Sequence, residues 1–220
     1  MNMDDLWLVL KSQPGVGVLI IDCNGRVLFC NDQAKRIYYG NQFNPVGLTI
    51  EEIEGPEFAA ERMPVIHSVI ETGKPMLLRH VRGGRHTEAL IWPMQNPENP
   101  PPRVMSITRQ LFETDESETS DNPYPCVDSH LVDLGPLDVL TKREIEVLAM
   151  VGHGVPLKSV AKELGIAQRT VERYRTDIAR KLNLNSIAEI ARVVQIAGLK
   201  ASDADLPRLH RWRDSSGGSH

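Results

Sequence analysis

The apolar positions of this chain form short runs rich in branched residues in its first half and recur at helical spacing in its second half. Five runs predict strands at the positions 16–22, 27–30, 75–81, 87–93 and 104–111. Between the second and third runs we expect a short helix after Asn31, and then a longer helix over 57–72 that Pro64 interrupts. This order predicts a five-stranded antiparallel sheet with helices on one face.

The stretch 140–199 predicts four helices in succession. Thr141 and Glu144 form a capping box at the start of the first helix, and a second capping box begins at Ser186. Gly165 stands between the second and third helices, where a left-handed residue permits a tight corner. Two short helices joined by a glycine turn are the helix-turn-helix arrangement. The fold class is therefore α+β, a sheet domain followed by an all-α four-helix domain.

The third predicted helix has two faces of opposite character. Its apolar face repeats at steps of three and four, and the residues are Val171, Tyr174, Ile178 and Leu182. Its polar face repeats at the same steps, and the residues are Arg169, Arg173, Thr176 and Arg180. Arginine bonds guanine bidentately or pairs with phosphate, so this face suits the major groove of DNA. The alternative is an ordinary solvated charged face.

Charge and composition agree with this interpretation. The net charge of −4 is unevenly distributed, since residues 1–132 hold 11 Lys or Arg against 18 Asp or Glu, whereas residues 133–200 hold 11 against 8. The positive segment is the helical one, as nucleic-acid binding requires. Three cysteines without C-x-x-C spacing argue against a disulfide framework and a zinc site. No apolar run approaches 18 residues, so we expect a cytoplasmic protein that does not enter a membrane.

The helical segment resembles the LuxR/GerE family of DNA-binding domains, particularly its NarL/FixJ branch. The resemblance is carried by residues such as Leu140-Thr141, Leu164-Gly165-Ile166 and Arg169-Thr170-Val171-Glu172. It implies that the third helix reads double-stranded DNA and that the fourth pairs two subunits. The expected DNA-binding residues are Lys158, Arg169, Thr170, Glu172, Arg173, Thr176, Arg180 and Lys181. The sequence departs from the family where Ala167 replaces the usual Ser or Thr cap.

The first 112 residues resemble a PAS sensory domain through Asp22, Gly25, Val27, Asn31 and Ala34, taken with the order of the elements. The resemblance implies small-ligand sensing and dimerisation. A pocket between sheet and helices is expected, walled by Val18, Ile20, Leu28, Ile66, Ile70, Leu90 and Ile107. We expect it either to pack shut or to hold a small apolar ligand.

No cofactor is evident from the sequence. His67 lies in mid-helix, where an axial haem ligand is less expected than a surface histidine. His80 and His86 flank a Gly-Gly turn and would bind a metal only with further ligands, so we expect them to face solvent and expect no metal. The sequence contains no combination of residues that is typical of an enzyme active site.

Two surfaces are predicted to form a homodimer. In the fourth helix, Val193 and Ile196 lie off the stripe that covers the other helices. At the start of the chain, Leu6, Trp7 and Leu10 lie on one side of an amphipathic helix, for which packing on its own sheet is the alternative.

The sequence thus predicts a PAS-like domain over 1–112, a flexible acidic linker over 113–133, a LuxR-type domain over 134–200 and a disordered tail over 201–220. The linker is rich in acidic residues, Ser and Pro, and would either tether the domains or shield the basic helix. The expected function is a transcription regulator that binds DNA, with RNA polymerase as a candidate partner. The alternative is a ligand-binding or protein-interaction scaffold whose helical domain binds a protein.

Overall fold

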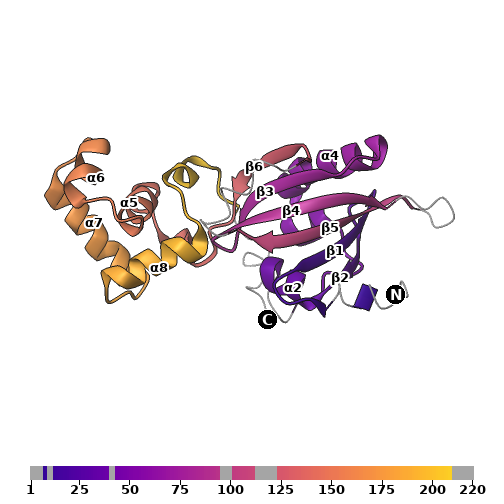
Figure 1. The fold of residues 1–220 in the computed structure, drawn as a ribbon, viewed down its shortest axis with the longest axis horizontal. Coiled ribbons are helices and arrows are strands. Elements are labelled where there is room, and N and C mark those ends of the chain that lie inside the picture. Colours follow the sequence, from indigo (N-terminus) through magenta and orange to yellow (C-terminus); the bar gives the residue numbers. More distant parts are fainter. Residues whose placement is uncertain (1–6, 9–11, 40–42, 95–100, 112–122, 210–220) are drawn as a thin grey trace.

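The computed structural model describes residues 7–8, 12–39, 43–94, 101–111 and 123–209. A sheet domain and a helical domain lie at opposite ends of an elongated molecule (Figure 1). The elements are β1 Gly17–Asp22, β2 Val27–Cys30, α2 Asp32–Tyr38, α3 Ile50–Glu54, α4 Pro56–Thr72, β3 Met76–Arg82, β4 Arg85–Met94, β5 Arg103–Gln110, β6 Cys126–Val132, η2 Gly135–Val139, α5 Lys142–Gly152, α6 Leu157–Glu163, α7 Gln168–Lys181, α8 Ile187–Ala197 and η3 Ala201–Asp205. This arrangement confirms the α+β class.

The described strands form one sheet in the order β2-β1-β5-β4-β3-β6. The strands β1 to β5 pair with one another antiparallel, as the sequence predicts, while β6 runs parallel to β3. Helices α2, α3 and α4 accompany this sheet, and α5 to α8 form the other domain (Figure 1). In the described part of the chain, no helix combines the length and apolar character that a membrane crossing requires.

The positions that carry the PAS resemblance build the first hairpin and its connection to α2. The carboxylate oxygen Oδ1 of Asp22 accepts hydrogen bonds from the backbone N–H of Asn24 and of Arg26, both at 2.9 Å. The buried side chain of Asn31 accepts from the backbone N–H of Val18 at 2.9 Å and of Ala34 at 2.8 Å. Asn31 is therefore both the N-cap of α2 and a clamp on β1.

Helix α4 packs on the sheet through Phe58, Ile66 and Val69, which are buried in the core of the N-terminal domain. The helix continues through Pro64, so the predicted interruption is wrong. Pro64 removes the bond to the carbonyl of Ala60. Both residues are exposed, so water can satisfy that carbonyl and the helix need not break.

Part of the segment predicted as a flexible linker is ordered. Residues 126–132 form β6, which pairs with β3 from Leu77 to Val81. Without β6, β3 would present a row of unpaired backbone groups at the sheet edge. The segment 126–132 therefore becomes a strand because the edge of β3 offers backbone hydrogen-bonding groups to pair with. The polar composition of the linker does not predict this pairing. Of the predicted linker, residues 113–122 lie outside the described residues.

The two domains meet in a packed junction. Val81 and Val132 of the sheet belong to the same core cluster as Leu134, Leu137 and the helices of the C-terminal domain. The tail predicted to be disordered contributes to it as far as residue 209. Its helix η3 packs on α5, and the bridge between Val132 and Arg208 brings the following residues to β6. The prediction of disorder is thus wrong for 201–209, and 210–220 lie outside the described residues.

Candidate nucleic-acid interface and ligand pocket

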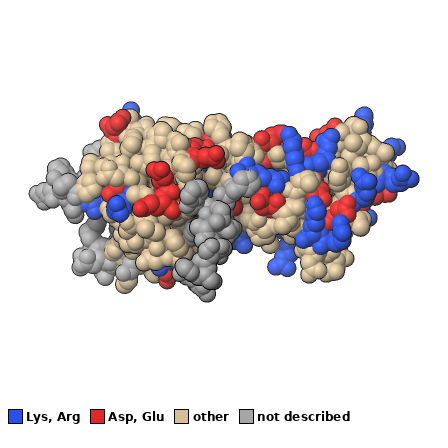
Figure 2. Space-filling view, turned by 180° about the vertical axis from the view of Figure 1, so that it is seen from behind, with Lys and Arg blue, Asp and Glu red and all other residues tan. Residues whose placement is uncertain are grey.

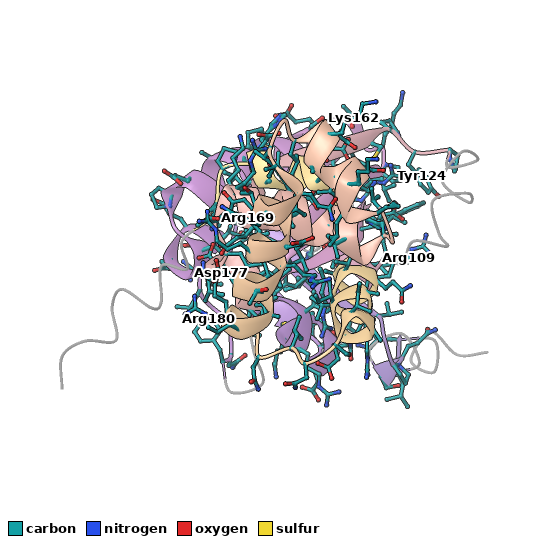
Figure 3. The ribbon with its side chains drawn as sticks, turned by 90° about the vertical axis from the view of Figure 1, so that its left-hand side faces the viewer. Arg109, Tyr124, Lys162, Arg169, Asp177 and Arg180 are labelled. Atoms are coloured by element: carbon teal, nitrogen blue, oxygen red, sulfur yellow. The ribbon has the colours of Figure 1, made fainter. Side chains whose placement is uncertain are left out.

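Helix α7 presents the expected arginine face to solvent. Arg169, Arg173, Thr176 and Arg180 are all exposed, whereas Val171 and Ile178 on the opposite side are buried. Figure 3 looks onto this end of the molecule and shows Arg169 and Arg180 toward the two ends of α7. The helix starts after Ala167, which provides no side-chain cap, in keeping with the departure noted in the sequence.

Local contacts leave the arginines of α7 free to turn toward a ligand. Arg180 pairs with Asp177 at 3.0 Å, but the Arg180 side chain is 76% exposed, and such surface pairs contribute little. The guanidinium of Arg173 lies 5.9 Å from the ring centroid of Tyr174. Glu172 accepts a hydrogen bond from Gln168 at 3.0 Å, which occupies one of its acceptor sites. Thr170 is half-buried at the start of the helix.

Two lysines of α6 extend the positive surface. Lys158 was expected from the sequence and is exposed. Lys162 is also exposed and was missed, although its place four residues further on the same helix predicts that it shares the face of Lys158. Figure 2 shows Lys and Arg side chains gathered over the C-terminal domain.

Lys181 makes an internal contact that its prediction as a DNA-binding residue did not include. Its ammonium lies 2.6 Å from Oε2 of Glu144, at the N-terminus of α5. Burial raises the pKa of Glu144, but the hydrogen bonds from Lys181 and from Thr141 outweigh that effect, so its pKa lies below the ordinary value. Lys181 therefore joins α7 to the capping box of α5.

The dimer surface predicted on α8 is only partly exposed. Val193 is half-buried and packs against the core of the C-terminal domain, so the expectation that it lies outside this packing is wrong. Ile196 is 39% exposed, and its carbonyl accepts a hydrogen bond from Gln110 of β5 at 2.7 Å. Ile187 is 60% exposed. Of the N-terminal candidates, Leu6 and Leu10 lie outside the described residues, while Trp7 packs against Phe29 of β2 with 5.1 Å between ring centroids. For Trp7, this contact favours packing on its own sheet.

Residues 138–194 match the family model of the bacterial regulatory proteins of the luxR family. The C-terminal domain is a luxR-family domain. The chain is 37% identical over 68 residues to the transcriptional regulatory protein FixJ of Azorhizobium caulinodans, covering 31% of this chain and 32% of FixJ. It is 40% identical over 55 residues to the oxygen regulatory protein NreC of Staphylococcus carnosus, covering 25% of each chain. The chain thus spans about a third or less of the length of these relatives.

Among solved structures, a complex of VqmA from Vibrio cholerae with ligand and DNA is similar over 91% of each chain, with 18% identity and a TM-score of 0.47. The match to the luxR-family model ends at residue 194, so it does not reach the last part of α8.

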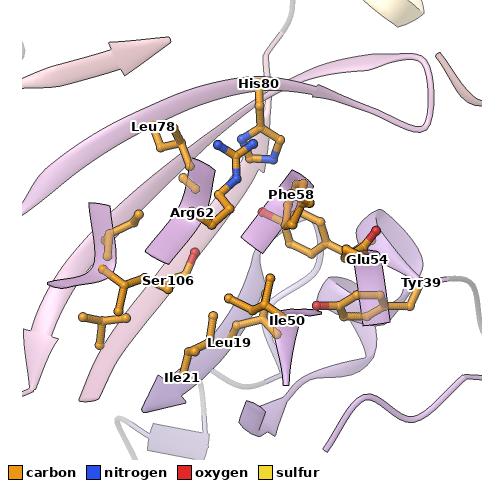
Figure 4. A pocket seen from close by; sticks show the side chains of 15 residues that line it. Leu19, Ile21, Tyr39, Ile50, Glu54, Phe58, Arg62, Leu78, His80 and Ser106 are labelled. Atoms are coloured by element: carbon orange, nitrogen blue, oxygen red, sulfur yellow. The ribbon is translucent and has the colours of Figure 1, made fainter. Parts of the chain in front are cut away.

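The N-terminal domain has a pocket between the sheet and its helices (Figure 4). Of the predicted wall residues, Ile66 lines this pocket, whereas Val18, Ile20, Leu28, Ile70, Leu90 and Ile107 do not. The residues that line it are Leu19, Ile21, Tyr38, Tyr39, Ile50, Glu54, Phe58, Arg62, Ile66, Leu78, His80, Ala89, Ile91, Val104 and Ser106. On β1, Leu19 and Ile21 line the pocket in place of the predicted Val18 and Ile20. Successive side chains of a strand point to opposite faces, so the prediction chose the wrong face of β1.

The pocket is also less apolar than predicted, because charged and aromatic groups form part of its lining. Arg62 and His80 are buried at 6% exposure each. The ring of His80 stacks on that of Tyr38 at 5.8 Å, and the hydroxyl of Tyr38 lies 2.6 Å from that of Thr108. Phe58 has the guanidinium of Arg62 at 4.6 Å and that of Arg82 at 5.0 Å from its ring centroid.

Burial sets the charge states at this end of the pocket. Desolvation, followed by the charges of Arg62 and Arg82, lowers the pKa of His80 well below its ordinary value, so its imidazole is neutral near pH 7. Desolvation also lowers the pKa of Arg62, to about 10, which still leaves it charged. The expectation that His80 faces solvent is therefore wrong.

His67 and His86, the other two histidines considered in the sequence analysis, have separate contacts. His86 is half-buried at the domain junction and lies 2.8 Å from Asp203, so it does not face solvent freely either. His67 is exposed on α4, as expected, and its Nε2 lies 2.8 Å from the carbonyl oxygen of Cys23.

Proposed function

We propose that this protein is a sequence-specific DNA-binding transcription regulator, in which α7 enters the major groove and the PAS-like domain provides the regulatory input. The observation that carries the proposal is the exposed arginine face of α7 inside the segment that matches the luxR family. The relatives that share this segment are named as a transcriptional regulatory protein and an oxygen regulatory protein.

The arrangement of the domains is compatible with DNA binding. Helices α6 and α7 lie at the end of the molecule away from the sheet, so the N-terminal domain does not cover the arginine face (Figure 1). Arg169 and Arg173 lie in the first half of α7, where side chains of a recognition helix reach base edges. Arg180 lies in its last turn, where phosphate is the expected partner.

We infer that two copies of the chain bind together on paired half-sites. Ile187 and Ile196 are the large apolar residues that α8 leaves exposed. Two-fold pairing would place the two recognition helices about one helical turn of DNA apart.

The test uses the full chain and a DNA site selected from a pool of random duplexes. Arg173→Ala should weaken binding to the selected site by about 1–3 kcal/mol and relax the base preference there. Arg180→Ala should weaken binding to selected and random duplexes alike, and should lower the slope of log K against log salt by about one. Fluorescence anisotropy at several salt concentrations measures both effects.

Arg36→Ala is the matched control, because Arg36 is an exposed arginine on α2 of the other domain. It removes the same charge and should leave the affinity within error of the unaltered chain. If the Arg173→Ala/Arg180→Ala double variant still binds as the unaltered chain does, α7 does not read DNA. The protein-binding scaffold would then be the better assignment.

A further inference from the structure

The pocket of the N-terminal domain has one polar end within an otherwise apolar lining. The apolar part comes from residues such as Leu19, Ile66 and Ile91. Arg62 and His80 form the polar end, where Figure 4 shows the guanidinium and the imidazole ring beside each other. The cavity measures about 60 Å³. At roughly 10–15 Å³ for each water-sized group, it accommodates a molecule of about four to six non-hydrogen atoms.

Hydrogen-bonding groups at this polar end lack partners among the described residues. Neither ring nitrogen of the buried His80 has a hydrogen bond. Nη1 of Arg62 has an ion-pair contact with Glu61 but no hydrogen bond, while Nη2 donates to Ser129 at 3.1 Å. Buried polar groups are nearly always hydrogen-bonded, so the two ring nitrogens of His80, which have no partner and lie beside Arg62 in the pocket lining, point to a bound polar group.

The charges around the pocket select between a neutral and an anionic ligand. Arg62 already has Glu61 at 2.6 Å, and Arg82 has Glu54 at 2.6 Å and Asp133 at 3.9 Å. Each buried guanidinium is therefore paired with a carboxylate. Glu54 also lines the pocket, so an incoming anion would share the pocket with a like charge.

We propose that this pocket binds a small uncharged molecule that presents a hydrogen-bond-accepting oxygen to Arg62 and His80 and an apolar remainder to Leu19, Ile66 and Ile91. Neutral imidazole carries one N–H donor, so Arg62 and His80 can together donate to one carbonyl or hydroxyl oxygen. The apolar remainder is held by the walls of the pocket. The inference goes beyond DNA binding and does not depend on it.

The experiment compares three probes of five non-hydrogen atoms each, namely butanone, propanoate and pentane. The full chain, with its isoleucine, leucine and valine methyl groups labelled, is titrated with each probe without DNA, and the methyl signals are followed by NMR. Butanone should shift the signals of Ile66 and Ile91 saturably, with an affinity at least about tenfold above those of propanoate and pentane, a gap of roughly 1.4 kcal/mol.

Two variants test the polar contact. His80→Phe keeps a ring against Tyr38 but removes both nitrogens, and it should weaken butanone at least about fivefold while leaving pentane unchanged. Arg62→Met should have the same effect on butanone, and His67→Phe, at an exposed position of α4, should have none.

Equal or tighter binding of propanoate would overturn the choice of an uncharged ligand. Equal binding of pentane would overturn the polar contact. Saturable shifts with none of the three probes would overturn the pocket as a site for ligands of this size. Because no DNA is present in this titration, a negative result would not affect the proposal that α7 binds DNA. Likewise, a protein whose α7 does not bind DNA could still bind butanone in this pocket.

Discussion

His86 and Asp203 lie 2.8 Å apart, although 117 residues separate them in the chain. His86 belongs to β4 of the sheet domain, and Asp203 to η3, which follows α8 of the C-terminal helical domain. Their side chains are 19% and 6% exposed, so the contact is largely shielded from solvent. It is a direct contact between the two domains.

We expect His86 and Asp203 to be energetically coupled. In a double-mutant cycle with His86→Phe and Asp203→Ala, the coupling in the free energy of unfolding should be about 0.5–3 kcal/mol, measured by urea denaturation. Asp203→Ala also removes the acceptor of the backbone N–H of Lys200, a loss that the cycle cancels because it occurs in both the single and the double variant. The control cycle uses Lys142 of α5 and Asp205 of η3, an exposed pair that should show no measurable coupling. Additive effects at His86 and Asp203 would show that the contact does not hold the domains together.

Gly135 at the domain junction should not tolerate a side chain. It has a positive φ of +52°, and a Cβ there would lie 2.5 Å from the backbone carbon of Gly83. Gly135→Ala should therefore destabilise the protein by the cost of the left-handed conformation plus about 1–3 kcal/mol of steric strain. Urea denaturation would measure the loss, and limited proteolysis would show whether the junction opens.

Gly165 provides the matched control for that substitution. Its φ is +66°, but its Cβ would meet no atom within 4 Å. Gly165→Ala should thus cost about 1–2 kcal/mol, the conformational cost alone. Equal losses at positions 135 and 165 would mean that the close approach of Gly135 to Gly83 does not persist in solution.

The helical domain was predictable because its decisive features are local. The capping box of Thr141 and Glu144 and the turn at Gly165 depend on residues within a few positions of each other. The arginine face of α7 follows from helical periodicity alone. The same periodicity predicts that Val171 and Ile178, on the opposite face of α7, are buried.

The pocket was assigned to the wrong face of β1 because both faces of that strand are apolar. Alternation fixes which residues share a face but does not say which face meets the helices. The structure places Leu19 and Ile21 toward the pocket, with Asn31 fixing β1 against α2. That choice depends on contacts across the fold, as does the burial of His80, whose neighbours Arg62 and Tyr38 are distant in sequence.

Glu144 should contribute stability that depends on pH. Its pKa is lowered in the folded protein, so the contribution is fully present above the ordinary pKa of a glutamate and is lost as the pH falls through the folded value. Glu144→Gln should cost about 1–3 kcal/mol at pH 7, since it removes the charge that Lys181 pairs with. Thermal or urea unfolding should be measured from pH 7 to pH 3. The difference in the free energy of unfolding between Glu144→Gln and the unaltered chain should become smaller at low pH. A difference that is independent of pH would exclude the ion pair as its source.

His80 should make the protein less stable in mild acid. Its pKa is lowered in the folded state by burial and by Arg62 and Arg82, so below about pH 6.5 the unfolded chain binds a proton that the folded chain does not. The stability of the unaltered chain should therefore fall by up to about 1.4 kcal/mol per pH unit relative to His80→Phe between pH 6.5 and 5. His67→Phe is the control, because His67 is exposed and should leave the slope unchanged. Urea denaturation at each pH measures the slopes, and parallel curves for the unaltered chain and His80→Phe would show that His80 is not held neutral by its surroundings.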